Sequence, residues 1–251
     1  MFVACSTRCF SRMPFETALR RIADLEFDKI DLAIDQNGPH IRPCDVVENM
    51  DSVLHRIRHG PSLTPAALDL DFGSIDAVNL RKRFEAICRL AKPLTVAVLT
   101  IPSAASGTPL ESEIERLGAL SEIASREGLV LTVATKAGTL AGDAKCAATL
   151  CKSIPGLGLT LDPSYCVVSA SAFDDLYPYV QNVHLRDTGK KPHEFQVRIG
   201  QGKIEYGRII TMLERNGYDR SLTIAILDHL DNPFEVEVET RKLKLLLESL
   251  L

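Results

Sequence analysis

The sequence contains no apolar run long enough to span a membrane and no amino-terminal targeting segment. The first ten residues, MFVACSTRCF, are apolar for only a few positions, and neither a basic segment nor a small-residue cleavage site accompanies them. A membrane helix needs about 20 consecutive apolar residues, and a secretory signal begins with a basic segment. We therefore expect a cytoplasmic protein without a membrane partner.

A paired-cysteine motif is also missing. The seven cysteines form no C-x-x-C pair and no zinc-type spacing, and their number is odd. Disulfide frameworks and zinc sites usually carry even, regularly spaced cysteines. We expect reduced, mostly structural thiols, which fits a cytoplasmic location. Cys5 and Cys9 have no base beside them in the sequence, so a cysteine nucleophile is disfavoured.

The chain has no excess of positive charge. It carries 29 Lys and Arg against 33 Asp and Glu, a formal net charge of -4. This balance lacks the basic footprint of a nucleic-acid-binding protein. With 251 residues, of which 45% are hydrophobic, the chain can bury a large core. This length suits one barrel-sized domain as well as two small ones.

One unit repeats along the chain, a short apolar and β-branched segment followed by an amphipathic helical segment. We expect strands within residues 2–6, 28–35, 63–72, 94–101, 129–135, 157–162, 182–187 and 222–227. The expected helices cover residues 14–25, 43–57, 75–91, 110–126, 143–152, 169–177, 204–217 and 233–251. This alternation predicts a (β/α)8 TIM barrel that occupies residues 1–251 as a single domain. An open doubly wound sheet is the alternative, but no G-x-G-x-x-G follows the first strand.

Polar clusters follow two of these predicted strands directly. LGLTLDPSY (residues 157–165) leads to Asp162, and VQNVHLRDT (residues 180–188) contains His184 and Asp187. Ligands of α/β folds bind where parallel strands end. These three residues are therefore the first candidates for a functional site.

The same segments resemble a known family. GLTLDPSY, VHLRD, IGQGKIEYGRII and NGYDRSLTI are similar to the second half of the xylose-isomerase-like TIM barrels. That superfamily contains sugar and sugar-phosphate isomerases and epimerases, a dehydratase of the inositol pathway, and the endonuclease IV group. The resemblance implies a divalent cation at the carboxyl-terminal mouth of the barrel. Its ligands would be a glutamate ending strand five, an aspartate ending strand six, a histidine in strand seven and a glutamate ending strand eight.

The chain departs from that ligand pattern at two of four positions. Asp162 and His184 match the aspartate and the histidine, whereas Ala134 and Ala225 stand in place of the two glutamates. Tyr165 also stands where many members carry a histidine. One carboxylate and one imidazole make a poor site for a divalent ion, because three or four ligands are usual. We therefore expect no metal of the family type and no other cofactor.

A metal-free polar pocket is the hypothesis that replaces the metal site. Lys136 lies two positions after Ala134 on the same face, so its ammonium group would face Asp162 in place of the cation. His184 and Arg186 share a face of strand seven, and Arg198 could join the pocket. Lys136, Asp162 and His184 are the candidate catalytic residues. In the competing interpretation, Lys136 is a solvated surface lysine and His184 a core histidine bonded to a carbonyl group.

Other residues near the predicted mouth are candidates for substrate contact. They are Arg8, His40, Tyr165, Arg186, Gln196 and Arg198. Arg198 and Lys136 together could hold a phosphate or a carboxylate, since paired cations commonly bind such anions. Asp187 has the opposite parity to His184, so we expect it to cap the following loop or to pair with an arginine. Gly200 and Gly202 are expected to form a tight turn.

Three functions from different classes remain open. The first is an isomerase or epimerase of a sugar, sugar phosphate or related polyol, with a rebuilt acid/base pair such as Lys136 with His184 or Asp162. The second is a non-catalytic relative that binds a carbohydrate or anionic polyol or acts as a regulatory protein. The third, a nuclease of the endonuclease IV type, is disfavoured because its metal site needs more histidines and carboxylates than align here. Whether the chain is an enzyme is therefore an open question at this stage.

The carboxyl-terminal segment is rich in leucine. Its apolar residues are more numerous than one barrel-facing stripe requires: Val236, Val238, Leu243, Leu245, Leu246, Leu247, Leu250 and Leu251. This composition predicts either a homodimer interface or packing over the chain's own barrel.

Overall fold

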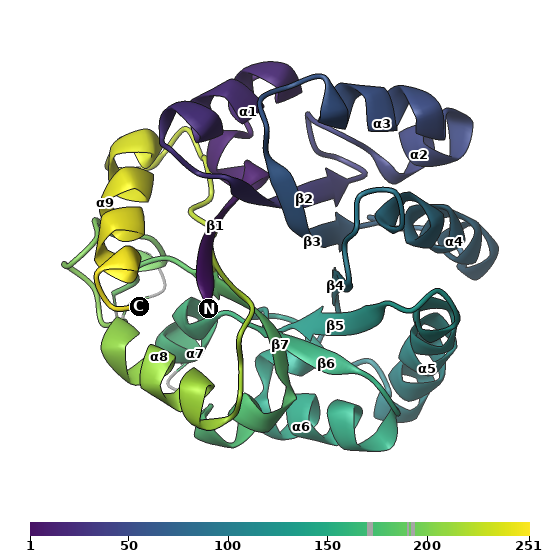
Figure 1. The fold of residues 1–251 in the computed structure, drawn as a ribbon. Helices are drawn as coiled ribbons and strands as arrows, with labels where there is room; N and C mark the ends of the chain where they lie inside the picture. The colour runs from purple at the N-terminus through teal and green to yellow at the C-terminus, as the bar shows by residue number, and fades with distance from the viewer. Residues whose placement is uncertain (170–172, 190, 192–193) are drawn as a thin grey trace.

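The eight predicted strands form a closed parallel barrel, with strand order β1 to β8 around the ring. The computed structural model describes residues 1–169, 173–189, 191 and 194–251. Figure 1 shows the helices arranged around the outside of the barrel, with α9 beside α1 and α8. The strands are β1 Phe2–Ser6, β2 Lys29–Asp35, β3 Thr64–Asp71, β4 Val98–Pro102, β5 Val130–Ala134, β6 Gly158–Leu161, β7 Val180–Leu185 and β8 Ser221–Ile224.

The α-helices are α1 Phe15–Asp24, α2 Pro43–Glu48, α3 Met50–Arg58, α4 Ala77–Ala91, α5 Leu110–Arg126, α6 Ala144–Ser153, α7 Pro163–Ser169, α8 Tyr206–Arg215 and α9 Val236–Glu248. Three 3-10 helices accompany them in the described chain: η1 Thr7–Phe10, η2 Leu140–Gly142 and η3 Asp174–Tyr179. None of the helices in the described part of the chain is long and apolar enough to cross a membrane.

Strand β3, whose sequence carries a proline and two aspartates, is fully paired with β2. The register runs from Lys29 opposite Thr64 to Asp35 opposite Asp71, with an irregularity after Ile30. Pro65 is tolerated because it is the second residue of the strand, next to that irregularity, where one ladder hydrogen bond is easily given up. The prediction of a strand within residues 63–72 is therefore confirmed.

Two helix predictions were wrong in their boundaries. The helix expected over residues 43–57 is divided at Asn49, whose φ of -154° and ψ of 81° are not helical. The Asn49 side chain accepts a hydrogen bond from the Ser52 amide and so starts a second helix. The helix expected over residues 169–177 is replaced by α7 before it and η3 at its end. Residues 170–172 of that prediction lie outside the described residues.

Two other helix ends follow their sequence signals. Asp143 accepts a hydrogen bond from the Cys146 amide at the start of α6, as its capping role predicts. Gly128 lies two residues after the end of α5 and has a φ of +75°, a conformation that favours glycine. Asp143 and Gly128 thus determine where α6 begins and where the chain turns from α5 into β5.

Candidate functional site

The barrel interior is polar below the mouth, which is unusual because branched apolar side chains normally fill this space. The hydroxyl groups of Thr100 on β4, Thr132 on β5 and Thr160 on β6 bond one another at 2.7 to 3.1 Å. Asn182 on β7 accepts a hydrogen bond from Ser221 at 3.0 Å. This hydrogen-bonded layer is fully buried and supports the floor of the site from below.

A buried histidine–aspartate pair lies directly above this layer. His184 Nε2 donates to Oδ2 of Asp31 on β2 at 2.8 Å, and Asn182 Nδ2 donates to the same oxygen at 3.1 Å. Burial alone would lower the pKa of His184. The hydrogen bond and charge of Asp31, with the charges of Asp69 and Asp162, outweigh burial and raise this pKa above its ordinary value of 6.5. His184 Nδ1 has no hydrogen-bond partner among the described residues.

Arg186 neutralises Asp162 on the opposite side of the mouth. Arg186 NH2 donates to Asp162 Oδ2 at 2.7 Å, and both side chains are more than nine-tenths buried. The backbone amide and hydroxyl of Ser164 donate to the other carboxylate oxygen. The guanidinium carbon lies 5.6 Å from the ring centre of Tyr165 and 5.0 Å from that of Phe195. This cation–π contact stabilises a guanidinium whose Nε and NH1 have no hydrogen-bond partner among the described residues.

A second arginine bridges two further aspartates. Arg8 Nε donates to Asp69 Oδ2 at 2.6 Å, and Arg8 NH1 donates to Asp35 Oδ2 at 2.8 Å. Burial would raise the pKa of Asp69, but the positive charges of Arg8, His184 and Lys136 lower it below its ordinary value. Asp69 is therefore a carboxylate at neutral pH, held in place by Arg8.

These groups surround a mouth cavity of about 230 Å³. The residues lining it are Arg8, Asp69, Leu70, Asp71, Pro102, Ala134, Lys136, Asp162, Tyr165, His184, Arg186, Ala225, Leu227 and His229. Lys136 is exposed and has no ion-pair partner among the described residues. Arg186, rather than Lys136, supplies the positive charge in contact with Asp162, since its longer, forked side chain reaches the carboxylate from β7.

The mouth cavity includes six of the nine predicted site residues. Lys136, Asp162, Tyr165, His184, Arg186 and Arg8 line it. His40 lies in a neighbouring cavity, where its Nε2 donates to the Met13 carbonyl at 3.0 Å. Gln196 and Arg198 are absent from both linings.

Gln196 and Arg198 differ in environment. The Gln196 side chain is occupied by the backbone of Leu227, donating to its carbonyl at 3.0 Å and accepting from its amide. It also donates to the Asn232 amide oxygen. Arg198 is exposed on the same loop. Gln196 therefore anchors its loop to the backbone of Leu227. Arg198 does not line the mouth cavity.

Asp187 organises the loop after β7. Its Oδ2 accepts hydrogen bonds from the amides of Gly200 at 2.8 Å and Gly202 at 3.0 Å. Gly200 has a φ of +87°, the left-handed conformation of a tight turn. Asp187 is thus a loop cap, as its parity on the strand predicts.

The two residues that the resemblance suggested as metal ligands already have partners. Asp162 binds Arg186, and His184 binds Asp31. Within the described chain there is no group of three or more His, Cys, Asp and Glu arranged to hold a metal ion. Ala134 and Ala225 line the cavity, where their methyl groups offer no ligand atom.

Several contributors to the site were not predicted from the sequence, among them Asp31, Asp69 and His229. Asp31 and Asp69 interrupt the apolar strands DKIDLAID and AALDLD, and a charged residue within a buried strand is rare unless it is paired. That signal could have identified both. His229 follows β8 in an irregular segment, and nothing in its sequence context indicated that it lies at the cavity.

Five of the seven cysteines are buried, and Cys44 and Cys146 are partly exposed. None of the seven cysteines, all of which lie in the described part of the chain, forms a disulfide. Burial raises the pKa of Cys88, Cys151 and Cys166 to about 12. Thiols of this kind remain protonated at neutral pH and unreactive.

Comparisons with known proteins agree with the barrel architecture. The profile of the family described as xylose isomerase-like TIM barrel matches residues 19–246. A probable 3-DHS dehydratase of Bacillus anthracis is 15% identical, with a TM-score of 0.75 over 97% of this chain and 98% of that chain. A xylose isomerase-like protein of Mycobacterium smegmatis, solved with magnesium, is 17% identical, with a TM-score of 0.75 over 99% and 97%.

A D-tagatose 3-epimerase-like protein is 18% identical, with a TM-score of 0.72 over 100% of this chain and 98% of that chain. Among proteins of curated function, none matches the sequence. Identities this low establish the common fold, while the family match covers most of the chain. The chain therefore belongs to the xylose isomerase-like TIM barrel family.

Proposed function

We propose that the mouth cavity binds a sugar-like or anionic polyol and transfers a proton on it without a divalent metal, as an isomerase or epimerase. The observation that carries this proposal is the buried Asp31–His184 pair at the cavity. Asp31 fixes the imidazole through Nε2, which leaves Nδ1 as the nitrogen available to a ligand. A histidine oriented by a carboxylate is a common general acid or base.

The ion pair between Arg186 and Asp162 supports a reaction that uses no divalent metal. In a metal-dependent relative, the cation would face Asp162 and His184. Here the Arg186 guanidinium contacts Asp162 instead, and Asp31 occupies His184. A divalent ion would have to displace Arg186 and would gain no carboxylate from Ala134 or Ala225. The residues present do not fit the family's metal, so the proposed reaction uses no metal and no other cofactor.

Lys136 is the second member of the proposed acid/base pair. An epimerase or isomerase removes a proton from the carbon beside a carbonyl group, and negative charge then develops on the carbonyl oxygen. The exposed ammonium group of Lys136 lies at the cavity, where as the acid of the pair it would donate a proton to that oxygen or stabilise its charge. The epimerase-like structural relative supports this class of reaction.

Solvent deuterium exchange tests the proposal. Purified protein is incubated in D₂O with EDTA and a panel of ketoses and ketose phosphates, and exchange at the carbon beside the carbonyl is followed by NMR. We expect exchange with at least one compound, reduced about 100-fold or more in His184→Gln and Lys136→Met. Matched exposed controls, His59→Gln and Lys145→Met, should keep the wild-type rate.

Two other outcomes would decide against the proposal. If EDTA abolishes the exchange and Mn²⁺ or Zn²⁺ restores it, the reaction depends on a divalent metal. Saturable binding of panel compounds without exchange would identify a non-catalytic carbohydrate-binding protein. That second function is favoured by one observation: both glutamates that usually move the substrate proton are replaced by alanine.

A further inference from the structure

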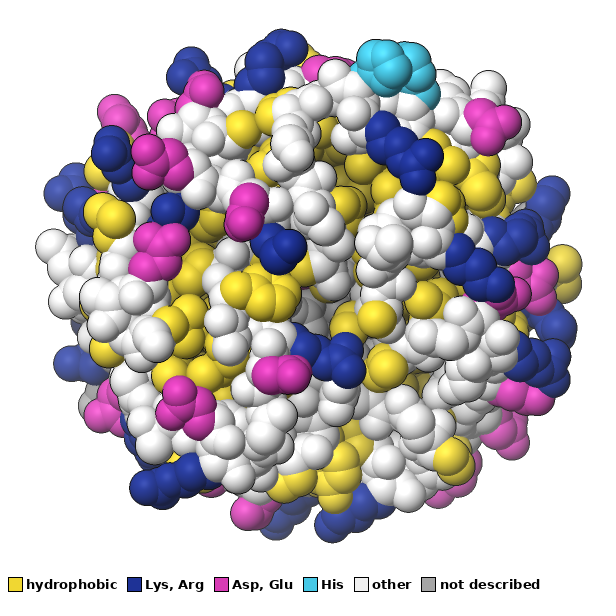
Figure 2. Space-filling view, viewed as in Figure 1, with side chains coloured by type: hydrophobic (Ala, Val, Ile, Leu, Met, Phe, Trp, Pro, Cys, Tyr) yellow, Lys and Arg dark blue, Asp and Glu magenta, His cyan; other side chains and the backbone are white. Residues whose placement is uncertain are grey.

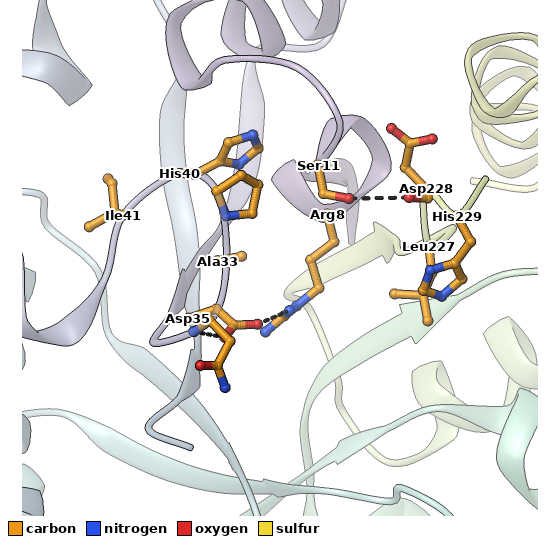
Figure 3. Close-up of a pocket in the computed structure, with 12 residues that line it drawn as sticks. Arg8, Ser11, Ala33, Asp35, His40, Ile41, Leu227, Asp228 and His229 are labelled. Carbon is orange, nitrogen blue, oxygen red and sulfur yellow. Dashed lines mark hydrogen bonds and ion pairs between the residues drawn. The ribbon is translucent and has the colours of Figure 1, made fainter. Parts of the chain in front are cut away.

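A second cavity adjoins the mouth cavity. Its volume is about 220 Å³. Figure 3 shows Ala33, Asp35 and His40 on one side, Leu227 and His229 on the other, and Arg8 between them. Arg8, Leu227 and His229 line both cavities. The two cavities therefore meet at Arg8, Leu227 and His229.

Arg8 forms a fixed partition between the two spaces. Its Nε binds Asp69, which lines the mouth cavity, and its NH1 binds Asp35, which lines the second cavity. Two short ion pairs hold the guanidinium in one orientation, so less conformational entropy is lost when a ligand packs against it. The two cavities thus lie in a constant geometry on either side of Arg8.

Most charged groups of the second cavity are already paired, namely Arg8, Asp35 and Asp228. Asn37 and His229, which also line it, are exposed to solvent. Asp228 accepts hydrogen bonds from the Arg12 amide and from Arg12 Nε, the latter at 2.7 Å. Burial, the dominant effect, lowers the pKa of His40 below its ordinary value, and the ring is neutral with Nε2 bonded to the Met13 carbonyl. An ion entering this space would compete with existing pairs, whereas an uncharged group would not.

Apolar side chains supply the remaining contacts of the second cavity. Ala33, Pro39, Ile41 and Leu227 line it, and Ile41 is fully buried. The mouth cavity differs, because Lys136 and His184 Nδ1 are without partners there among the described residues. One space is therefore suited to oxygen-rich or anionic groups and the other to uncharged, largely apolar groups.

We propose that the second cavity binds the uncharged, apolar substituent of a two-part ligand, such as the aglycone of a glycoside, whose polyol occupies the mouth cavity. The polyol part of this inference rests on the proposed function, while the apolar site stands on its own lining. A cavity of about 150 Å³ is known to hold benzene, so a ring of that size fits. Burying a phenyl in place of a methyl group should raise affinity about 10-fold to 100-fold.

Phenol is the probe that tests the apolar site without reference to any sugar. Saturation-transfer NMR should detect phenol bound to the wild-type protein at concentrations of about 1 mM. Ala33→Leu, which fills the second cavity, should abolish the signal, and the same change on the exposed face of α5, Ala119→Leu, should not. Asn37→Trp, on the exposed rim, is a second blocking variant if Ala33→Leu fails to fold.

The glycoside test uses methyl and phenyl glycosides of the panel sugars. The phenyl form should bind at least about 10-fold tighter to wild type, and this preference should disappear in Ala33→Leu. No phenol signal, or a signal unchanged by both blocking variants, would overturn the apolar site. Phenol binding at the site with no preference for phenyl glycosides would overturn the two-part ligand. Phenol binding with no sugar binding would contradict the proposed function alone.

Discussion

At the residue scale, the mouth is built from opposite charges that neutralise one another. Arg186 pairs with Asp162, Arg8 with Asp69, and His184 with Asp31. Buried charges are tolerated only when they are paired. These pairs depend on residues far apart in the sequence, which is why the sequence predicted the side chains of the mouth better than their partners.

The Asp31–His184 pair makes a specific prediction about pH. One carboxylate oxygen of Asp31 has no hydrogen-bond partner among the described residues, so the imidazolium is the main stabiliser of its charge. NMR titration should give His184 a pKa above 6.5 in the wild-type protein, and a lower pKa in Asp31→Asn, because burial then acts without the carboxylate. The exposed control Asp51→Asn should leave the titration unchanged.

The same shift has a consequence for stability. Because the folded-state pKa of His184 is raised, protonation stabilises the folded state. This contribution is complete below the unfolded pKa of about 6.5 and is lost as pH rises through the folded value. In urea unfolding from pH 5 to 9, the free energy of unfolding should therefore fall over that window. The fall should be smaller in Asp31→Asn. An unchanged His184 pKa in Asp31→Asn would contradict the assigned pair.

At the element scale, the loop after β7 depends on the close approach of backbone to the Asp187 carboxylate. A Cβ added to Gly202 would overlap Asp187 and would lie 2.5 Å from the Thr188 carbonyl oxygen. A contact of that length forces the loop to shift and to lose the hydrogen bond from the Gly202 amide. The loop conformation therefore requires glycine at this position for space, although its sequence context only suggested a turn.

Gly202→Ala should lower the free energy of unfolding by about 1–3 kcal/mol, the usual range for overpacking with loss of a buried hydrogen bond. The matched control is Gly118→Ala inside α5, where a Cβ meets nothing within 4 Å. That control should stabilise the protein by about 0.5–1 kcal/mol, because alanine favours helix more than glycine does. Equal effects of the two variants in chemical denaturation would refute the packing argument.

Element prediction from sequence succeeded at some local signals and failed at others. The strand expected over residues 94–101, for example, begins only at Val98. The strand with Pro65 and the Asp143 cap of α6 were both readable from residue type and position. The break at Asn49 was not, because the apolar periodicity of residues 43–57 continues through it. The 3-10 helix η3 begins at Asp174 after a stretch whose composition also suits an α-helix.

At the scale of the whole molecule, the repeated pattern was sufficient to predict the closed barrel, because eight buried parallel strands of this spacing close naturally with helices outside. The ligand class could not be predicted in the same way. It depends on which side chains meet across the barrel axis, such as β2 with β7. Figure 2 shows positive and negative side chains interspersed over the face in view, without a continuous patch of one sign.

Helix α9 has apolar side chains on its outer surface as well as on the face that packs on the barrel. Val236, Leu243 and Leu247 are buried, and α9 packs on β1, η1 and β8. Val238 and Leu245 remain 45% and 57% exposed. They are seven residues apart and so lie on one face of the helix. Packing over the chain's own barrel thus accounts for one stripe of α9, and the exposed stripe is unaccounted for within the described chain.

We propose that this exposed stripe, continued by the terminal residues Leu250 and Leu251, forms a homodimer interface. Burial of clustered apolar side chains between two copies removes them from water and favours association. Light scattering after size exclusion should give a dimer mass at micromolar concentration, and Val238→Lys with Leu245→Lys should give a folded monomer. Val78→Lys on α4 removes a valine that is 78% exposed on another helix and should leave the dimer intact. A monomer mass for wild type up to about 100 μM would limit α9 to its packing on the barrel, since stable interfaces bind more tightly than this.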